Sequence, residues 1–313
     1  MMHFLVRRAI QLVSVLLVMS IVVFSFTLML PGDVTVSILG EAATESERAA
    51  LREVLGLDKP IAVQYLNWLG EVVSGNFGTS LKTGEPILDM LATRLPATLE
   101  LTLLAVAVSL IVGVPTGIIA ALNRNRWPDT LISAVAMSSV AVPYFLFGIL
   151  LIMLFSVTLR WLPPSGYVPF FADPIGNLRS MVMPTLTLGL AQAALVTRQT
   201  RAALIGVMSQ DFVRTARAKG AGEARVVLFH ALRHTMIAVV TVVSLQMGAL
   251  IGGAVVTETI FSLPGLGRMI VDGTFERDFP VVQGAVLVVV VGVILVNLLT
   301  DLSYLILDRR IKA

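Results

Sequence analysis

Residues that could perform covalent or metal chemistry are few in this sequence. The chain has no cysteine, which excludes a thiol nucleophile, a disulfide framework and a cysteine-ligated metal site. It contains neither an H-E-x-x-H nor a G-x-S-x-G motif, and no glycine is followed directly by lysine. A phosphate-binding loop of the form G-x-x-x-x-G-K-[ST] is therefore absent. Any ATP hydrolysis that serves this protein must take place on another chain.

Two histidines are the remaining candidates for metal ligands. His230 and His234 stand four residues apart in a segment that we expect to be helical, so their side chains would share one face. No carboxylate or third ligand stands at helical spacing from them. The spacing therefore favours ordinary packing of a helix face, and we expect no metal site.

The composition indicates an integral membrane protein. Hydrophobic residues make up 56% of the 313 residues and charged residues 14%, whereas soluble domains carry about 25% charged residues. A helix needs about 20 apolar residues to cross a bilayer. Six stretches without Asp, Glu, Lys or Arg meet or approach this length: Ala9–Gly32, Leu101–Asn123, Thr130–Leu159, Ser180–Thr197, Thr235–Thr257 and Phe279–Thr300. We therefore expect an all-α membrane protein with six transmembrane helices.

Two of these stretches need a further interpretation. The third is too long for one straight span and contains Pro143, which predicts a kink. The first resembles a secretory signal peptide, because Arg7 and Arg8 precede it. A signal core is about 7–15 residues long and is followed by a small-residue cleavage site. This stretch is longer, and it ends in the turn-like sequence LMLPGD, so an uncleaved first span is favoured.

The distribution of basic residues predicts the orientation. If both termini are cytoplasmic, the inside segments 1–8, 124–129, 198–234 and 301–313 hold 14 Lys and Arg in 64 residues. The outside segments hold 9 in 109 residues, and 15 of the 20 acidic residues. Lys and Arg are enriched in cytoplasmic loops. We therefore expect both termini in the cytoplasm.

The largest outside segment, residues 33–100, should contain two helices. The sequence from Thr44 to Gly56 has the form of a capped amphipathic helix. A second helix is expected from Pro60 to Val73, and its aromatic residues could anchor it to the membrane, pack on other loops or contact a partner; packing is favoured. Three glycines then predict a region rich in turns, at Gly75, Gly78 and Gly84.

The other outside loops are rich in proline and glycine. WLPPSG (Trp161 to Gly166) and FSLPGLGRM (Phe261 to Met269) predict rigid turns instead of extended helix. Such loops can seal a cavity, receive a soluble protein or simply connect two spans, and the sequence leaves these alternatives open.

The predicted spans contain no ionisable residue, which argues against a proton-coupled transporter. Four polar or small residues are candidates for lining a pathway: Gln192, Gln246, Gly248 and Asn297. Hydrogen bonding and close packing between helices would explain the same residues, and this is the safer interpretation.

The segment from Asp211 to Val240 is the most informative part of the chain. Ser209 is a candidate N-cap and Gly220 a candidate helix end. Between them Phe212, Ala216 and Gly220 fall on one narrow face, while Arg214 and Arg217 point elsewhere. A narrow face lets a partner groove approach the backbone closely.

A second helix is expected from about Glu223 to His234, leading back to the membrane. The competing interpretation of the segment is a basic helix lying on anionic lipid. Such a helix would need a bulky apolar face, and this one offers mainly alanine, so protein docking is favoured.

The same segment resembles the EAA motif of ABC importer permeases. Arg214-Thr215-Ala216 occupies its first positions and Gly220 its glycine, in the RTARAKG form of the dipeptide, oligopeptide and nickel permease family. Ala238 stands where that family has a proline, which puts a kink there in doubt. Further strings resemble the first permease of this family in order and spacing: LPGD (30–33), LGLDKP (55–60), QYLNWL (64–69), GNFGTS (75–80), RLPATLELTLLA (94–105), HALRH (230–234) and ETIFSLPGLGRM (258–269).

The resemblance implies a type I ABC importer transmembrane fold with an additional N-terminal helix. It implies a first span in residues 1–32, an external segment at 33–97, and a permease domain at 98–313 with a cytoplasmic coupling loop at 205–235. The resemblance implies that seven residues of this loop contact the ATPase subunit: Phe212, Arg214, Thr215, Ala216, Lys219, Gly220 and Ala221.

The implied partners are a second homologous permease, two cytoplasmic ATPase subunits, a periplasmic or lipid-anchored binding protein and membrane lipid, with no nucleic acid. ATP and magnesium would be bound by the ATPase subunits, and this chain would carry no cofactor. The location would be the bacterial inner membrane. Peptides are the expected substrate, while nickel chelates, glutathione and opines are the alternatives.

Two other classes remain to be weighed. A gradient-driven secondary transporter would function without ATPase subunits. An intramembrane enzyme is disfavoured, because no nucleophile, base or metal constellation can be assembled from these residues.

Overall fold

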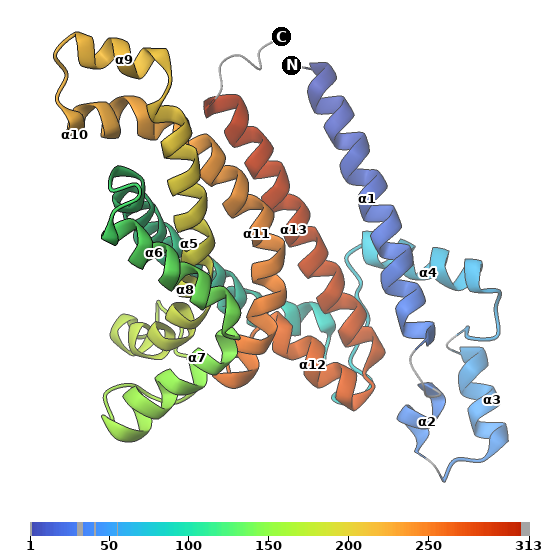
Figure 1. Ribbon diagram of the computed structural model, residues 1–313. Helices are drawn as coiled ribbons and strands as arrows, with labels where there is room; N and C mark the ends of the chain where they lie inside the picture. The colour runs from blue at the N-terminus through green and yellow to red at the C-terminus, as the bar shows by residue number, and fades with distance from the viewer. Residues whose placement is uncertain (1, 30–33, 41, 55, 308–313) are drawn as a thin grey trace. The chain divides into compact units, whose positions relative to one another are not determined.

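A computed structural model describes residues 2–29, 34–40, 42–54 and 56–307 (Figure 1). These residues form helices joined by turns, with one isolated β-bridge between Thr79 and Pro86. The helices of the first third are α1 (Met2–Met29), α2 (Val34–Leu39), α3 (Glu45–Val54), α4 (Ile61–Val73) and α5 (Ile87–Leu122). The middle third has α6 (Trp127–Ala141), α7 (Tyr144–Leu151), the π-helix η1 (Ile152–Thr158) and α8 (Pro174–Met208). The last third has α9 (Asp211–Ala218), α10 (Glu223–Arg225), the π-helix η2 (Val226–Ala231), α11 (Leu232–Ile260), α12 (Leu266–Glu276) and α13 (Phe279–Leu307).

The chain divides into two compact units. Unit 1 comprises residues 1–96 and 265–294, and unit 2 comprises residues 97–264 and 295–313. The turn expected at residues 30–33 and the last residues, 308–313, lie outside the described part of the chain.

In unit 1, α4 packs on α1 through aromatic side chains. The ring of Phe24 lies 5.6 Å from both Tyr65 and Trp68, centroid to centroid. The hydroxyls of Ser20 and Tyr65 are hydrogen-bonded at 2.8 Å. Aromatic pairs at this separation add to the stability gained from burying their area. These aromatic residues therefore pack within the chain, but on the helix of the first predicted span and not on another loop as predicted.

Helix α3 begins with the predicted capping box. The side chain of Glu47 accepts the backbone N–H of Thr44 at 2.8 Å, and the N–H of Glu47 donates to the Thr44 hydroxyl at 3.4 Å. Donation by the Thr44 backbone N–H lowers the pKa of Glu47 below its usual value. Gly56 follows the helix with a φ of +66°, a left-handed conformation that favours glycine. Both predicted ends of this helix are therefore confirmed, within a residue or two.

The turns that precede α5 in unit 1 are held by one buried carboxylate. Asp278 lies between α12 and α13 and accepts hydrogen bonds from the Ser80 hydroxyl and from the backbone N–H groups of Leu81, at 3.2 Å, and Lys82, at 3.4 Å. Buried charged groups are stable only when they are hydrogen-bonded or paired. Asp278 therefore fixes the turn-rich segment after α4 to the corner between α12 and α13.

The FSLPGLGRM segment is only partly a turn. Residues 261–265 form the predicted turn, but α12 begins at Leu266 and continues to Glu276. The prediction without helix was wrong for Leu266 to Met269, because Leu266 and Met269 are three residues apart and are both buried against Ile87 and Leu91 of α5. Tertiary packing of this apolar face outweighs the weak helix preference of the two glycines.

In unit 2, α5 and α8 approach closely at glycines. A Cβ built on Gly113 would lie 2.7 Å from the Val196 side chain, and one on Gly117 would lie 2.7 Å from the Thr197 carbonyl oxygen. The hydroxyls of Thr116 and Thr197 are hydrogen-bonded at 2.8 Å across the same contact. Small residues at four-residue spacing let membrane helices pack backbone to backbone.

Gly117→Leu is expected to separate α5 from α8. The new side chain would meet a backbone carbonyl that cannot rotate away, and overpacking of this kind costs about 1–3 kcal/mol or more. The thermal unfolding midpoint of the chain in lipid nanodiscs should fall markedly. Gly206→Leu is the matched control, because the position on α8 faces open space. Equal midpoints for the two variants would contradict the close contact.

The predicted spans agree with the structure in type and differ in length. Within the described residues, four helices are long and apolar enough to cross a membrane, at Ile87–Leu122, Pro174–Met208, Glu223–Gly248 and Phe279–Thr300. The third predicted span is a bent pair of helices that would make a fifth, with α7 starting after Pro143. The predicted kink is thus confirmed. In the N-terminal helix α1, the described apolar part is Ile10–Ser25.

Helix α11 continues past the predicted end of the fifth span and brings a carboxyl group into the protein. Glu258 is fully buried and accepts a hydrogen bond from the Thr98 hydroxyl at 2.6 Å. Its backbone carbonyl accepts the N–H of Leu263 at 2.8 Å, which closes the turn after the helix. Glu258 lies one residue beyond the predicted span Thr235–Thr257, so helix α11 continues past the charge-free stretch and the carboxyl group is held outside it.

Candidate functional site

The candidate site is the end of unit 2 at which α8 turns into α9, α10 and η2 and returns as α11 (Figure 1). It contains the whole segment that the sequence predicts as a docking element. Its geometry follows from where each helix stops.

Helix α8 ends later than expected, which moves the start of α9. Ser209 is the C-cap of α8, directly after its last residue Met208, and its hydroxyl donates to the Gly206 carbonyl at 2.8 Å. Gln210 takes the N-cap position of α9 with extended backbone. The prediction of Ser209 as the N-cap is therefore wrong: its side chain is used to close the preceding helix.

Helix α9 ends at the predicted glycine. Gly220 has a φ of +81°, and the N–H of Ala221 donates to the Ala216 carbonyl at 3.2 Å. A left-handed residue followed by a hydrogen bond of this kind is the usual way to end a helix. The prediction of Gly220 as the helix end is confirmed.

Replacing Gly220 tests the left-handed turn. A Cβ at this position would meet open space, so the cost of Gly220→Val is backbone strain of about 1–2 kcal/mol. Gly220→Asn is the control, because asparagine tolerates this conformation. Limited proteolysis should cut the loop faster in the valine variant than in the asparagine variant. Equal cleavage rates would contradict a strained left-handed turn.

The apolar face of α9 packs inside the chain. Val213 is completely buried and Ala216 is 8% exposed. They join a small core whose other buried members come from α8 and η2: Leu204, Val207, Val226, Val227 and Ala231. Phe212 and Ala221 are half-buried against this core. The expectation that the face with Phe212 and Ala216 is open to a partner is therefore wrong, because the protein covers it with its own residues.

The opposite face of α9 and the turn after it are exposed. Arg214 has 74% of its side chain exposed, and Thr215, Ala218, Lys219 and Gly220 are exposed as well. This set is called the outer face below. Apart from two basic side chains, its residues are small, so a partner would meet positive charge and could approach the backbone closely.

An ion pair closes the corner between α9 and α10. Arg217 donates from Nε and Nη2 to the two carboxylate oxygens of Glu223 at 2.7 and 3.1 Å. The hydrogen bond to Glu223 raises the pKa of Arg217. Both side chains are largely exposed, so water and salt screen the pair and it orients the corner more than it stabilises the fold. Beside it lies a shallow cavity of about 360 Å³ whose lining includes Arg124 and Met208.

His230 and His234 lie on the helix that leads back from the loop, where they pack against neighbouring side chains. The ring of His234 lies 4.8 Å from the ring of Phe212, centroid to centroid. His230 is half-buried in η2. From Glu223 to Ile260 the chain is helical without interruption, so the predicted second helix forms and continues through Ala238 without a break.

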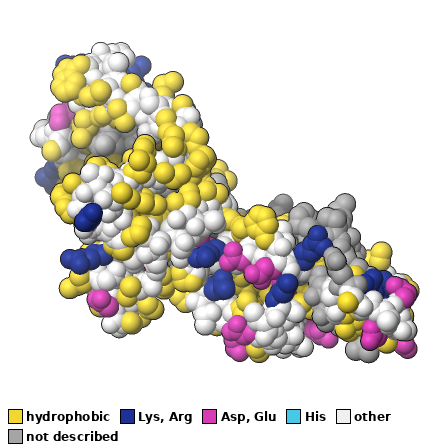
Figure 2. All heavy atoms as spheres, turned by 90° about the horizontal axis from the view of Figure 1, so that it is seen from below, with side chains coloured by type: hydrophobic (Ala, Val, Ile, Leu, Met, Phe, Trp, Pro, Cys, Tyr) yellow, Lys and Arg dark blue, Asp and Glu magenta, His cyan; other side chains and the backbone are white. Residues whose placement is uncertain are grey.

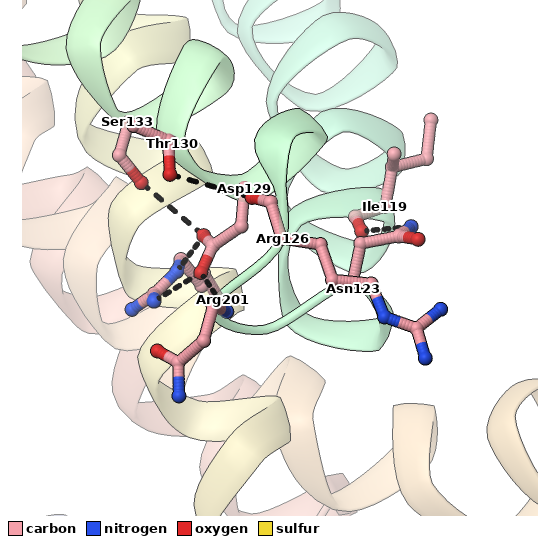
Figure 3. Close-up of polar contacts among 8 residues, drawn as sticks. Ile119, Asn123, Arg126, Asp129, Thr130, Ser133 and Arg201 are labelled. Atoms are coloured by element: carbon pink, nitrogen blue, oxygen red, sulfur yellow. Dashed lines mark hydrogen bonds and ion pairs between the residues drawn. The ribbon is translucent and has the colours of Figure 1, made fainter.

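A second feature of this end is the corner between α5 and α6, which is clamped to α8 (Figure 3). Arg201 donates from Nε to Asp129 at 2.5 Å and from Nη2 at 2.7 Å. The same carboxylate accepts the Asn125 backbone N–H at 2.9 Å and the Ser133 hydroxyl at 3.4 Å. The side chain of Asp129 is only 5% exposed. A bidentate pair of this kind fixes both direction and distance.

The clamp was missed by the sequence interpretation, which placed both residues in cytoplasmic segments without pairing them. Asp129 opens one helix and Arg201 lies near the end of another, 72 residues away. No spacing rule connects them. The only available signal was one acidic residue in a short segment whose other charged residues, Arg124 and Arg126, are basic.

The candidate pathway residues lie on three helices of unit 2. Gln192 is half-buried on α8, and its amide oxygen is buried and accepts no hydrogen bond among the described residues. Gln246 and Gly248 are half-buried on α11, and Asn297 is exposed on α13. Their role as pathway residues stays a prediction.

Comparisons with known proteins cover the whole chain. Residues 113–313 match the family model described as "Binding-protein-dependent transport system inner membrane component", and residues 1–102 match its N-terminal companion. The glutathione transport system permease protein GsiC of Escherichia coli (strain K12) is 42% identical over 312 residues, which cover 100% of this chain and 99% of that one. A putative peptide transport system permease protein of Brucella abortus (strain 2308) is 41% identical, covering 98% of both chains.

Among solved structures, the inward-facing MetNI methionine ABC transporter is similar to the chain in fold. The TM-score is 0.57 at 17% sequence identity, and the match covers 72% of this chain and 99% of that one. At this identity the comparison bears on the fold alone.

Proposed function

The chain belongs to the family of binding-protein-dependent transport system inner membrane components and is the permease subunit of an ABC importer, and from this premise we propose how it is oriented, where it is driven and what it carries. Permeases of this family work with a second permease, with ATPase subunits and with a binding protein. The chain itself is a transport subunit, and ATP hydrolysis belongs to a separate subunit.

The outer face is the proposed docking site of a cytoplasmic ATPase subunit. The observation that carries this proposal is the division of α9 into a face buried by the chain and a face of small and basic residues left exposed. A short helix held rigidly on its own core can transmit a push without bending. Its exposed basic side chains suit acidic groups on the partner. ATP and magnesium are bound by that partner.

The proposed force path leads from the outer face into the membrane helices through two rigid connections. The first is the small core beneath α9, which ties the loop to α8 and to η2, and η2 continues directly into α11. The second is the clamp of Asp129 and Arg201, which ties the α5–α6 corner to α8. Because α8 belongs to both, movement of the loop carries these helices with it.

Six transmembrane spans with both termini in the cytoplasm are proposed. The four long helices and the bent pair give five. Helix α1 supplies the sixth: its 28 residues make a helix about 42 Å long, whereas the hydrocarbon core of a bilayer is about 30 Å thick. The excess of Lys and Arg in the inside segments supports the orientation, with the outer face in the cytoplasm.

Short peptides are the proposed substrate class. The relatives named above are a glutathione permease and a putative peptide permease, and glutathione is itself a tripeptide. One pathway is shared with a second, homologous permease, because six spans without an internal repeat form only half of such a pathway.

The function is tested by uptake into proteoliposomes. The chain is reconstituted with its second permease and ATPases, and binding protein and labelled glutathione or dipeptide are added outside. We expect uptake that requires both internal ATP and binding protein. Uptake driven by an ion gradient without ATPase subunits would contradict the proposal. Mass spectrometry of the ligand that purifies with the binding protein identifies the substrate separately.

A further inference from the structure

The connection after η1 together with the first turns of α8, residues 160–179 and called the loop below, exposes large apolar side chains that the fold does not cover. Trp161, Phe170, Ile175 and Leu178 are all more than half exposed, and Phe171 is 98% exposed. The rings of Phe170 and Phe171 form an edge-to-face pair with centroids 5.6 Å apart. Contiguous apolar groups of this kind mark a surface that is covered by something else.

The loop holds these side chains outward by internal hydrogen bonds. The Tyr167 hydroxyl donates to Glu100 at 2.8 Å, the Gly166 N–H donates to the Phe261 carbonyl at 3.0 Å, and the Asn177 amide donates to the Val168 carbonyl at 2.8 Å. Burial and the bond to Glu100 raise the pKa of Tyr167 to about 12. The tip with the two phenylalanines is therefore presented by a fixed frame.

The exposed residues continue the apolar surface of the neighbouring helix. Met153 and Val157 of η1 are exposed, and Trp161 follows at the same four-residue interval and packs on Phe155 at 5.9 Å between ring centroids. Ile175 and Leu178 are three residues apart at the start of α8, so they share one face. In the space-filling view hydrophobic side chains make up much of the visible surface (Figure 2).

The charges of the loop favour one occupant. Residues 160–179 contain two basic residues, Arg160 and Arg179, both exposed, and one acidic residue, Asp173. The Asp173 carboxylate is engaged in capping α8, accepting the N–H groups of Ile175 at 3.1 Å and Gly176 at 3.0 Å. The loop thus presents aromatic rings between two exposed arginines in the sequence. This combination suits the boundary between lipid phosphates and acyl chains.

We propose that the loop of residues 160–179 lies in the outer-leaflet interface of the membrane, with Phe170 and Phe171 among the acyl chains and Arg160 and Arg179 at the level of the lipid phosphates. This anchor fixes the depth of the continuous helix formed by α7 and η1 and of the start of α8. The inference uses the membrane location of the chain and does not depend on the transported substrate.

The test exploits the absence of cysteine from this chain. Phe171→Cys carries a nitroxide spin label in the complete transporter, held in nanodiscs of phosphatidylethanolamine and phosphatidylglycerol. Collisions with oxygen, which concentrates in lipid, are compared with collisions with a water-soluble nickel chelate. Lys82→Cys is the control, because Lys82 is exposed in the external turns of unit 1. The complex that contains the unchanged, cysteine-free chain is treated with the same spin label, and its signal gives the background from the other subunits.

We expect the oxygen-to-nickel ratio at position 171 to exceed that at position 82 severalfold, without binding protein. A water-like ratio equal to that of position 82 would overturn the proposal. Protection of position 171 that appears only when binding protein is added would also overturn it, by assigning the loop to that protein. A Phe170→Cys label should give the same ratio as position 171. Since no uptake is measured, failure here leaves the transport function standing.

Discussion

Ala216→Glu is expected to abolish most ATP-driven uptake while leaving insertion of the chain into the membrane unchanged. Ala216 is 8% exposed and contacts the core beneath α9. A glutamate there leaves a charge without a partner in that core, which costs about 3 kcal/mol or more. The loop would open locally, because the rest of unit 2 has its own core. Uptake and binding-protein-stimulated ATP hydrolysis are measured in proteoliposomes.

The matched control for this variant is Ala218→Glu. Ala218 lies in the same helix but is exposed, so the glutamate remains in water and α9 keeps its packing. Proteolysis of the loop should therefore accelerate in the Ala216 variant only. Should the Ala216 variant retain its ATPases and normal stimulation by binding protein, the packing of α9 would not matter for coupling.

The second large effect is expected at the clamp between the α5–α6 corner and α8. Arg201→Met removes both guanidinium hydrogen bonds and leaves the Asp129 carboxylate buried with two weaker donors. Breaking one partner of a buried pair costs about 3–5 kcal/mol. Arg201 is 30% exposed, which lets water soften the loss, so the lower end of that range applies. The free energy of unfolding in mixed micelles measures it.

The double variant Asp129→Leu with Arg201→Met measures the interaction energy of the two side chains, apart from the cost of losing each one alone. Replacing both charges by apolar groups is often nearly neutral, but here the Asn125 N–H also loses its acceptor, at about 1 kcal/mol. The double variant should therefore be more stable than Arg201→Met alone. A double variant whose loss equals the sum of the two single losses would show that the two side chains do not interact.

Local sequence signals predicted the local structure well. Thr44 and Glu47 form the expected capping box, Gly220 ends α9 in the left-handed conformation, and Pro143 separates α6 from α7. Each of these depends on residues within four positions of one another. Backbone conformation and capping are determined at that range, so sequence alone is sufficient.

Predictions failed where the outcome depended on distant residues. The burial of Ala216 requires Val226 and Val227, which return to α9 only after the turn at Gly220. Charge-free stretches located the spans but not the helix ends, because polar residues extend α8 and α11 beyond the apolar region. The pairing of Asp129 with Arg201 and the burial of Glu258 against Thr98 are both tertiary contacts. No local sequence pattern predicts these two contacts.

The central claim is that the outer face of α9 meets a cytoplasmic ATPase subunit, and a cross-link tests it most directly. Lys219→Cys, in a chain that has no other cysteine, is coupled to a short photoactivated reagent in the assembled transporter. Lys82→Cys, in the external turns, serves as the control. We expect a covalent adduct between position 219 and an ATPase subunit and none from position 82. An active, assembled transporter in which position 219 gives no such adduct would contradict it.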